Sequence, residues 1–291
     1  GSLFKAMLAK QREARAAADN VAHDEGGLRS RATAGSPMGP GGTLTSLRGG
    51  IGRLAESVAE SLGDVARTDE QVTDISRDSD GFVVTHGRAG ARPTQIRALN
   101  VVLAVPAYVA SKLLESLSPD AVPRLDTVKY ASLAVVCTGH RLDQIRHGLH
   151  GFGYLIPPNE NRQTLGCLWT SSIFDGASPD DCVLLRTMVG GALHPDLVDR
   201  SDNAIMAAVR RDVFDVLGVH GDPEFFRIFR HRRAIPQYGL DHDAELAAAN
   251  AAERAHPGLY FTGSALRGVA MIDCVADAFR TADRIVNACH G

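Results

Sequence analysis

The segment LYFTGSALRGVAMIDCVADA, residues 259–278, contains a short apolar run, a turn with two glycines and the start of a long helical pattern. Residues 259–262 predict a strand and residues 269–289 predict a helix. A strand that leads through a turn into a helix exposes backbone N–H groups at the helix start, which favours an anion or a polarised carbonyl. The same residues also fit an ordinary tight turn with glycine where elements approach closely. The segment alone leaves both interpretations open.

Outward from this segment, strand-like runs and helical periodicity alternate along the chain. The run Asp78-Ser79-Asp80-Gly81 predicts a hairpin turn between strands at 72–75 and 82–84. Further strands are predicted at 100–105, 131–136, 153–156, 164–170, 183–189 and 225–229, and helices at 3–18, 51–62, 203–217 and 244–255. Residues 24–42, rich in Gly, Ser and Pro, predict a flexible linker. This order indicates an α/β or α+β fold rather than a bundle or a sandwich.

Composition excludes several classes of protein. The 291 residues are 44% hydrophobic and carry 31 basic against 34 acidic side chains, which excludes collagen-like and fully disordered chains. A net charge of −3 gives no general reason to bind nucleic acid. No apolar run reaches the roughly 18 to 20 residues of a membrane-spanning helix. The five cysteines are widely spaced without a CxxC pair, which argues against a disulfide framework and suits a reducing cytoplasm.

Metal and hydrolase sites find no support in the sequence. Four histidines, His140, His147, His150 and His194, lie in regions predicted to be loops, and no two histidines show the i, i+4 spacing of a helical metal site. The pair Ser171-Ser172 lacks the glycine-flanked turn of a nucleophilic serine. We therefore assign no metal ligand, no catalytic residue and no general acid or base.

Six blocks, in order from about residue 45 to the end, resemble one enzyme family. They are TSLRGGIGRL (45–54), VVLAVPA (101–107), GFGYLIP (151–157), TMVGG (187–191), IPQY (235–238) and the tail from 259. Together they resemble the oxygen-dependent protoporphyrinogen and coproporphyrinogen oxidases of haem synthesis, FAD-dependent members of the amine oxidase superfamily. No GxGxxG follows a strand in this sequence, although that turn holds the cofactor pyrophosphate. The chain thus resembles the C-terminal portion of a family member.

The resemblance implies an α/β fold in which the FAD-binding domain is discontinuous in sequence. Residues 45–107 and 257–291 would form parts of that domain, and residues 108–256 a substrate-binding domain built on a mixed sheet, α+β in character. Residues 1–44 would be the end of a helical subdomain followed by a loop.

The resemblance also assigns candidate site residues. For FAD it implies Val72, on the adenine side, and a tail group comprising Gly263, Val269, Ala270 and Met271. For the porphyrinogen it implies Phe152, Gly153, Leu155 and Met188, whose apolar character suits a large flat macrocycle. Each of these residues could instead serve core packing.

His231 stands where the family often places a tryptophan near the flavin. It could pack on the flavin ring, and the basic run 230–233 could attract propionate groups or an anionic membrane surface. A solvated basic edge also explains that run.

The implied reaction is oxidation of a porphyrinogen to the porphyrin, at CH–CH groups, with FAD as cofactor and oxygen as acceptor. The implied setting is cytoplasmic, with peripheral contact at the inner face of the membrane and a homodimer both left open, and without nucleic acid. Two alternatives remain: an amine oxidase or desaturase relative, and a truncated tetrapyrrole-binding fragment without turnover.

Overall fold

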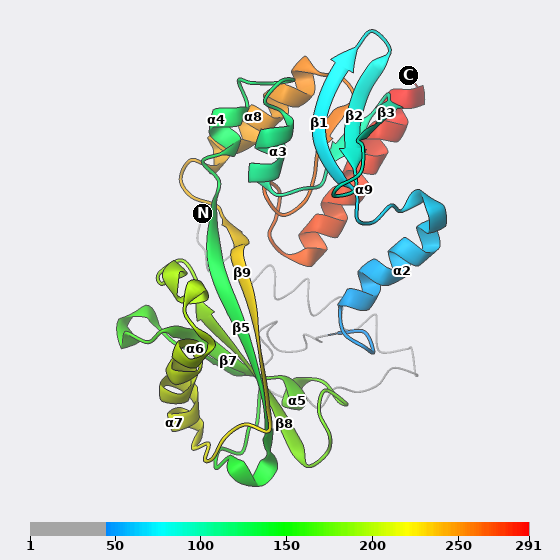
Figure 1. Ribbon diagram of the computed structural model, residues 1–291. Helices are drawn as coiled ribbons and strands as arrows, with labels where there is room; N and C mark the ends of the chain where they lie inside the picture. Colours follow the sequence, from blue (N-terminus) through cyan, green and yellow to red (C-terminus); the bar gives the residue numbers. More distant parts are fainter. Residues whose placement is uncertain (1–44, 291) are drawn as a thin grey trace, which may run out of the picture. The chain divides into compact units, whose positions relative to one another are not determined.

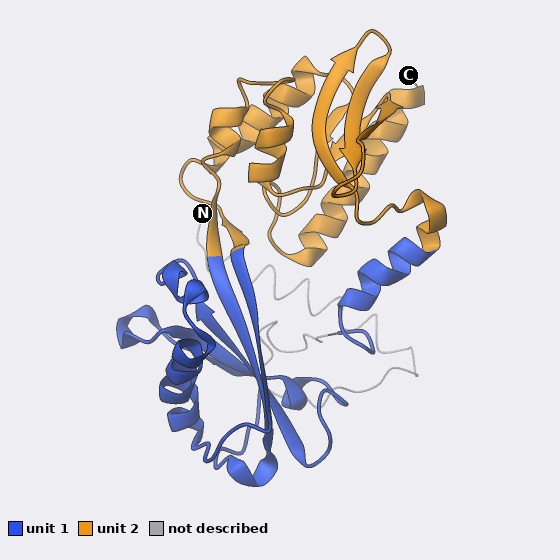
Figure 2. Cartoon of the chain, in the orientation of Figure 1, with its two compact units in different colours: residues 1–60, 132–232 blue, residues 61–131, 233–291 orange. Residues whose placement is uncertain are grey.

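The computed structural model describes residues 45–290, which divide into two compact units. Of the described residues, unit 1 contains 45–60 and 132–232, and unit 2 contains 61–131 and 233–290 (Figures 1 and 2). Residues 108–131 and 233–256, which the resemblance places in a substrate domain, group with unit 2 by their contacts. The predicted helix 3–18, the linker 24–42 and the subdomain 1–44 lie outside the described residues.

Unit 1 is built on a five-stranded sheet with the order β6-β7-β8-β5-β9. The pairs β6–β7, β7–β8 and β8–β5 are antiparallel. The strands are β5 (Lys129–Arg141), β6 (Gly153–Leu155), β7 (Thr164–Trp169), β8 (Cys182–Gly190) and β9 (Phe225–Gln237). The short helical segments are η2 (Leu142–Gln144), η3 (Pro158–Glu160), α5 (Thr170–Ile173) and η4 (Pro195–Asp199).

One face of this sheet is covered by a continuous helical segment. It comprises α6 (Asp202–Val209), the π-helical turn η5 (Arg210–Phe214) and α7 (Asp215–Leu217). Ala134 and Val136 of β5, Leu185 of β8 and Ile205 of α6 belong to the apolar core between sheet and helices. Alternate residues along each strand therefore face this core, and the residues between them face the opposite side.

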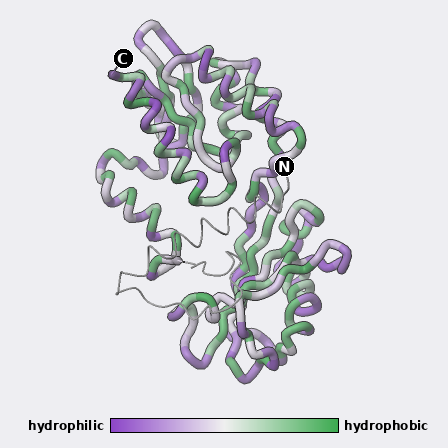
Figure 3. Tube along the Cα trace, turned by 180° about the vertical axis from the view of Figure 1, so that it is seen from behind, coloured by the Kyte–Doolittle hydropathy of each residue, from purple (hydrophilic) through white to green (hydrophobic). Residues whose placement is uncertain are grey.

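Unit 2 combines two smaller sheets with helices. The antiparallel sheet holds β1 (Gln71–Asp78), β2 (Gly81–Gly87) and β3 (Thr94–Ala98), while β4 (Val101–Leu103) pairs in parallel with β10 (Leu259–Phe261). The helices are η1 (Gly63–Val65), α3 (Ala107–Leu113), α4 (Val122–Leu125), α8 (His242–Ala255) and α9 (Met271–His290). The helix α2 (Gly52–Leu62), whose residues up to Glu60 group with unit 1, buries none of its residues. Figure 3 shows hydrophobic and hydrophilic residues alternating along α2.

Most predicted elements are confirmed. Asp78 pairs with Gly81 across the expected hairpin, and the backbone N–H of Asp80 donates to the Asp78 carboxylate at 2.9 Å. The strands β5 and β9 extend well beyond their predicted ends, and β3, α3 and α4 had no predicted counterpart. The prediction that His140 lies in a loop is wrong, because it is a fully buried residue of β5.

The fold is therefore mixed α/β, as predicted. Among residues 45–290, no helix is long and apolar enough to cross a membrane.

Candidate functional site

The turn between β10 and α9, in unit 2, is tied together by one tyrosine. The Tyr238 hydroxyl donates to the Ser264 carbonyl at 2.7 Å and accepts from the Gly268 N–H at 2.8 Å. Its ring stacks on His242 with the centroids 3.8 Å apart. Burial raises the pKa of Tyr238, so the phenol keeps the proton that it donates. The turn is thus held at both ends by a single side chain.

Two glycines in this turn have different roles. A Cβ on Gly268 would lie 2.3 Å from the Asp273 Cβ, and its φ is +131°, so only glycine fits there. Gly263 has φ of +100°, but a Cβ there would meet no atom within 4 Å. Gly268, which the sequence did not single out, is therefore the sterically required residue, whereas Gly263 borders open space.

Buried polar groups fix the start of α9 against β10. The Thr262 hydroxyl donates to the Asp277 carboxylate at 2.7 Å, and Asp277 is only 3% exposed. Arg267 donates to the Phe261 carbonyl at 2.7 Å and to the Asn250 side chain at 2.8 Å. Because these bonds join strand, turn and helix, the orientation of the helix start is well defined.

The first residues of α9 present backbone donors beside apolar side chains. Val269, Ala270 and Met271 are exposed, and within the described residues their backbone N–H groups have no acceptor. The Ala270 carbonyl accepts from the N–H groups of Asp273 and Cys274 and so begins the helix. Free N–H donors at a helix start, next to exposed apolar side chains, fit the polar edge and flat face of a flavin ring.

Val72 belongs to a different sheet of unit 2 from the tail residues. It lies on β1, opposite His86 and beside a β-bulge, and it is 37% exposed. Its exposure leaves its backbone accessible to a ligand, but no described interaction joins it to the β10–α9 turn. Its role as an adenine-side contact stays a prediction.

The predicted substrate residues lie in unit 1, and the strand register brings three of them to one face. Gly153 lies opposite Leu168, and Leu155 opposite Gly166, which in turn lies opposite Met188. These positions alternate with the core residues Tyr154, Cys167 and Thr187. We call this side of the sheet, away from α6, η5 and α7, the open face.

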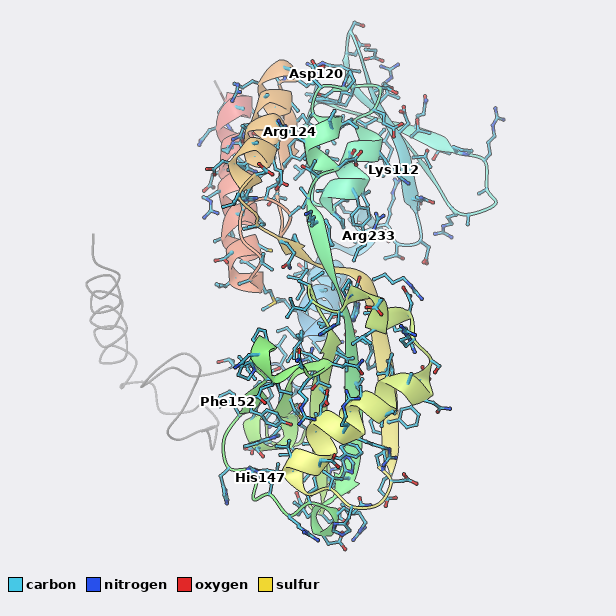
Figure 4. The ribbon with its side chains drawn as sticks, turned by 90° about the vertical axis from the view of Figure 1, so that its left-hand side faces the viewer. Lys112, Asp120, Arg124, His147, Phe152 and Arg233 are labelled. Atoms are coloured by element: carbon cyan, nitrogen blue, oxygen red, sulfur yellow. The ribbon has the colours of Figure 1, made fainter. Side chains whose placement is uncertain are left out.

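Phe152 is not part of this set. It precedes β6, is half-buried, and its carbonyl accepts from the N–H of Trp169, a core residue, at 2.9 Å (Figure 4). The alternation along the strand places Phe152 opposite to Leu155 in direction. Residue 153 is glycine for a steric reason, since a Cβ there would lie 2.0 Å from the Cys167 carbonyl oxygen.

Two contacts give the register between β5 and β9. The Ser132 hydroxyl donates to the Arg232 carbonyl at 2.6 Å, and the Phe225 ring lies 3.3 Å from the position of a Cβ on Gly139. Both contacts fit one antiparallel register, which places His231 opposite Leu133 on the open face. His231 is exposed there. The open face thus gathers Leu155, Met188 and His231 on three strands.

The structure also adds open-face residues that the motifs did not indicate. They occupy positions between or beside those above: Leu168 on β7, Arg186 on β8, Val135 and Cys137 on β5, and Arg227 and Phe229 on β9. The period-two alternation of β7 and β8 could have identified Leu168 and Arg186, but the sequence does not reveal which strands are neighbours.

The predicted basic run 230–233 is largely engaged within the protein. Arg230 pairs with Asp202 and donates to the Val198 carbonyl at 3.0 Å, and Arg232 pairs with Asp199 at 2.7 Å. The guanidinium of Arg233 lies over the Tyr108 ring, 4.4 Å from its centroid (Figure 4). A freely solvated basic edge therefore describes His231 alone.

The predicted site residues do not coincide with the cavity between the loops of unit 1. A cavity of about 590 Å³ lies between the loops 142–149 and 171–183, and none of the predicted site residues lines it. All five cysteines are free, as expected. In the described part of the chain, no group of three or more His, Cys, Asp or Glu side chains could hold a metal ion.

Comparison with known proteins places these features in a family. Residues 4–286 match the family described as flavin containing amine oxidoreductase. The chloroplastic protoporphyrinogen oxidase of rice (Oryza sativa subsp. japonica) is 30% identical over 260 residues, covering 86% of this chain and 48% of that protein. The coproporphyrinogen III oxidase of Bacillus subtilis (strain 168) is 26% identical, covering 82% of this chain and 52% of that protein.

A solved structure agrees with these relatives. The crystal structure of a protein from Exiguobacterium sp. 255-15, assigned as a protoporphyrinogen oxidase, superposes with a TM-score of 0.71 at 26% identity. It covers 82% of this chain and 51% of that one. The chain spans about half the length of the relatives that it matches. On the match of nearly its whole length, this chain belongs to the family of flavin-containing amine oxidoreductases.

Proposed function

We propose that the protein takes part in FAD-dependent oxidation of a porphyrinogen, protoporphyrinogen IX or coproporphyrinogen III, to the porphyrin, with oxygen as acceptor. The observation that carries the proposal is the open face of unit 1, where Leu155 and Met188 lie on one apolar surface with Leu168. Relatives named for both oxidations cover more than four fifths of this chain.

The residues present fit one end of the cofactor. The exposed start of α9, with the backbone N–H groups of Val269, Ala270 and Met271, would hold the flavin ring, and Val72 would lie toward the adenine. The flavin would supply the acceptor for hydrogen removed from the substrate. Tyr238 would keep the turn in place through its two hydrogen bonds to Ser264 and Gly268. Apolar side chains would exclude water from the macrocycle.

The test uses the protein encoded by its complete gene, supplied with FAD. We expect porphyrin fluorescence to appear in air when either porphyrinogen is added, together with peroxide release. A soluble, flavin-loaded protein that forms no porphyrin from either substrate would reject the proposal.

A panel of substrates distinguishes the proposed porphyrinogen oxidase from the first alternative, an amine oxidase or desaturase relative. An amine oxidase or desaturase relative would release peroxide with amines, or desaturate a carotenoid precursor, and would leave porphyrinogens unchanged. The second alternative, a tetrapyrrole-binding fragment, predicts porphyrin binding by this 291-residue chain without flavin or turnover. A yellow, flavin-bearing preparation of the chain would contradict it. The proposal includes a cytoplasmic location, and it leaves a homodimer and peripheral contact with the membrane open.

A further inference from the structure

The open face of unit 1 carries two arginines in one row across the sheet. Arg186 on β8 lies directly opposite Cys137 on β5. The β5–β9 register places Arg227 opposite the same cysteine from the other side, since Ser132 meets Arg232 and Gly139 meets Phe225. Two strand spacings separate the backbones of Arg186 and Arg227, which is about 10 Å.

These two guanidinium groups lack partners, in contrast to the other arginines on the strands of unit 1. Arg230 and Arg232 pair with aspartates, as described above, and Arg141 pairs with Asp181 at 3.2 Å. Arg186 and Arg227 are exposed, and among the described residues neither forms a hydrogen bond or an ion pair. None of the strands β5 to β9 contains an Asp or a Glu. Within residues 45–290, these strands therefore carry two arginines on the open face and no acidic side chain of their own to pair with them.

Apolar and aromatic side chains surround the two charges. Leu168 lies beside Arg186, Val135 and Met188 occupy the next row, and Phe225 and Phe229 are each about half exposed, at 46%. Burial raises the pKa of the Cys137 thiol while Arg186 acts in the opposite direction, which is consistent with a guanidinium lying close to the thiol. A flat apolar ligand with acidic groups on one side matches both the shape and the charge of such a surface.

We propose that Arg186 and Arg227 bind carboxylates of the tetrapyrrole, so that the open face recognises the acid side chains of the substrate as well as its ring. The inference rests on the proposed function for the identity of the ring. The guanidinium forks suit bidentate pairing with carboxylates, and the cysteine between them leaves room for both side chains to converge.

The experiment measures equilibrium binding of coproporphyrin III and of its methyl ester to the full 291-residue chain, by porphyrin fluorescence. We expect Arg186→Gln and Arg227→Gln each to weaken binding of the acid about tenfold, the effect of removing one charge-assisted hydrogen bond. Binding of the ester should not change. Arg232→Gln is the matched control, because Arg232 lies on the same strand as Arg227 but is engaged by Asp199 of η4. Arg186→Lys should retain part of the affinity, since it keeps the charge but loses the fork.

Each outcome decides a separate point. Unchanged binding of the acid in both variants, or equal losses for acid and ester, would overturn the role of the arginines. Absence of porphyrin binding by the wild-type chain would also overturn it. If the arginines prove necessary for binding the acid but the complete protein oxidises no porphyrinogen, the proposed reaction fails and the carboxylate site stands. Conversely, oxidation that is insensitive to both substitutions would retain the reaction and reject the site.

Discussion

The two faces of the unit 1 sheet use the same strands for opposite purposes. Toward α6, η5 and α7, the buried Asp212, only 1% exposed, accepts from the Gln163 N–H at 2.8 Å and from Arg211 Nε at 2.9 Å. On the same face, four buried polar atoms have no partner among the described residues: His140 Nδ1, Thr164 Oγ1, Trp169 Nε1 and Thr187 Oγ1. Toward the open face, Arg186 and Arg227 have no partner within residues 45–290, and Leu155 is 76% exposed. Burial on the helix-covered face therefore supplies stability, whereas the exposed side chains of the open face leave their interactions available to a ligand.

Substitutions on the two faces of the unit 1 sheet should therefore have different effects. A residue facing the helices should affect unfolding, whereas an exposed one on the open face should affect binding and leave unfolding nearly unchanged. Leu133 and Val135 lie on the open face but are buried, at 9% and 8% exposure, and should behave like core residues. The largest exception is Gly153, where the backbone of the neighbouring strand leaves no room for a Cβ.

The first prediction tests the requirement for glycine at position 153. Gly153→Ala should lower the free energy of unfolding by about 4 kcal/mol, because steric overlap with the Cys167 carbonyl adds to the strain of a positive φ. Chemical denaturation measures the loss. Gly263→Ala is the control, with φ also positive but open space around the Cβ, and should cost about 1 kcal/mol. Similar losses in the two variants would show that the close approach of β6 and β7 is not what requires glycine at 153.

The second prediction compares a leucine from each face. Leu185→Ala, at a fully buried core position, should lower the free energy of unfolding by about 3 kcal/mol. Leu155→Ala should change it by less than about 0.5 kcal/mol. The fluorescence of Trp169, the single tryptophan of the chain, follows the unfolding of unit 1 during denaturation. A large loss for Leu155→Ala would mean that the open face is covered in the folded chain.

The third and smallest prediction concerns pH on the helix-covered face. Burial lowers the pKa of His140 from 6.5 to about 4, with Arg210 acting in the same direction. The unfolded chain therefore takes up this proton first as pH falls. The resulting stability is fully present above the unfolded pKa, and it decreases between pH 6.5 and pH 4.

At pH 5.5 the loss from His140 should be about 1 kcal/mol relative to neutral pH. His140→Gln should remove that part of the pH dependence of the unfolding midpoint. His231→Gln, at an exposed position of β9, is the matched control and should follow the wild-type profile. A His140→Gln profile that parallels the wild type between pH 7.5 and 5.5 would contradict the assignment.

Several elements could be predicted because their signals are local. The hairpin at Asp78 to Gly81 rests on turn chemistry within four residues, and α9 on periodicity within one segment. His140 was assigned to a loop because its neighbours in sequence are polar, although β5 continues through it and buries it completely. Strand ends are decided by pairing with β8, which a local pattern does not contain.

The sequence by itself determined the mixed α/β class, because local periodicity distinguishes strands from helices, and the family, because the order of its blocks resembles that family. It also supplied Leu155, Met188 and the tail as site predictions. Only the tertiary structure decided that Phe152 stands apart from Leu155, that Gly268 rather than Gly263 is sterically required, and that Arg186 and Arg227 share one row. The physical reason is that strand order and register bring distant residues together, and the local sequence of one strand does not specify either of them.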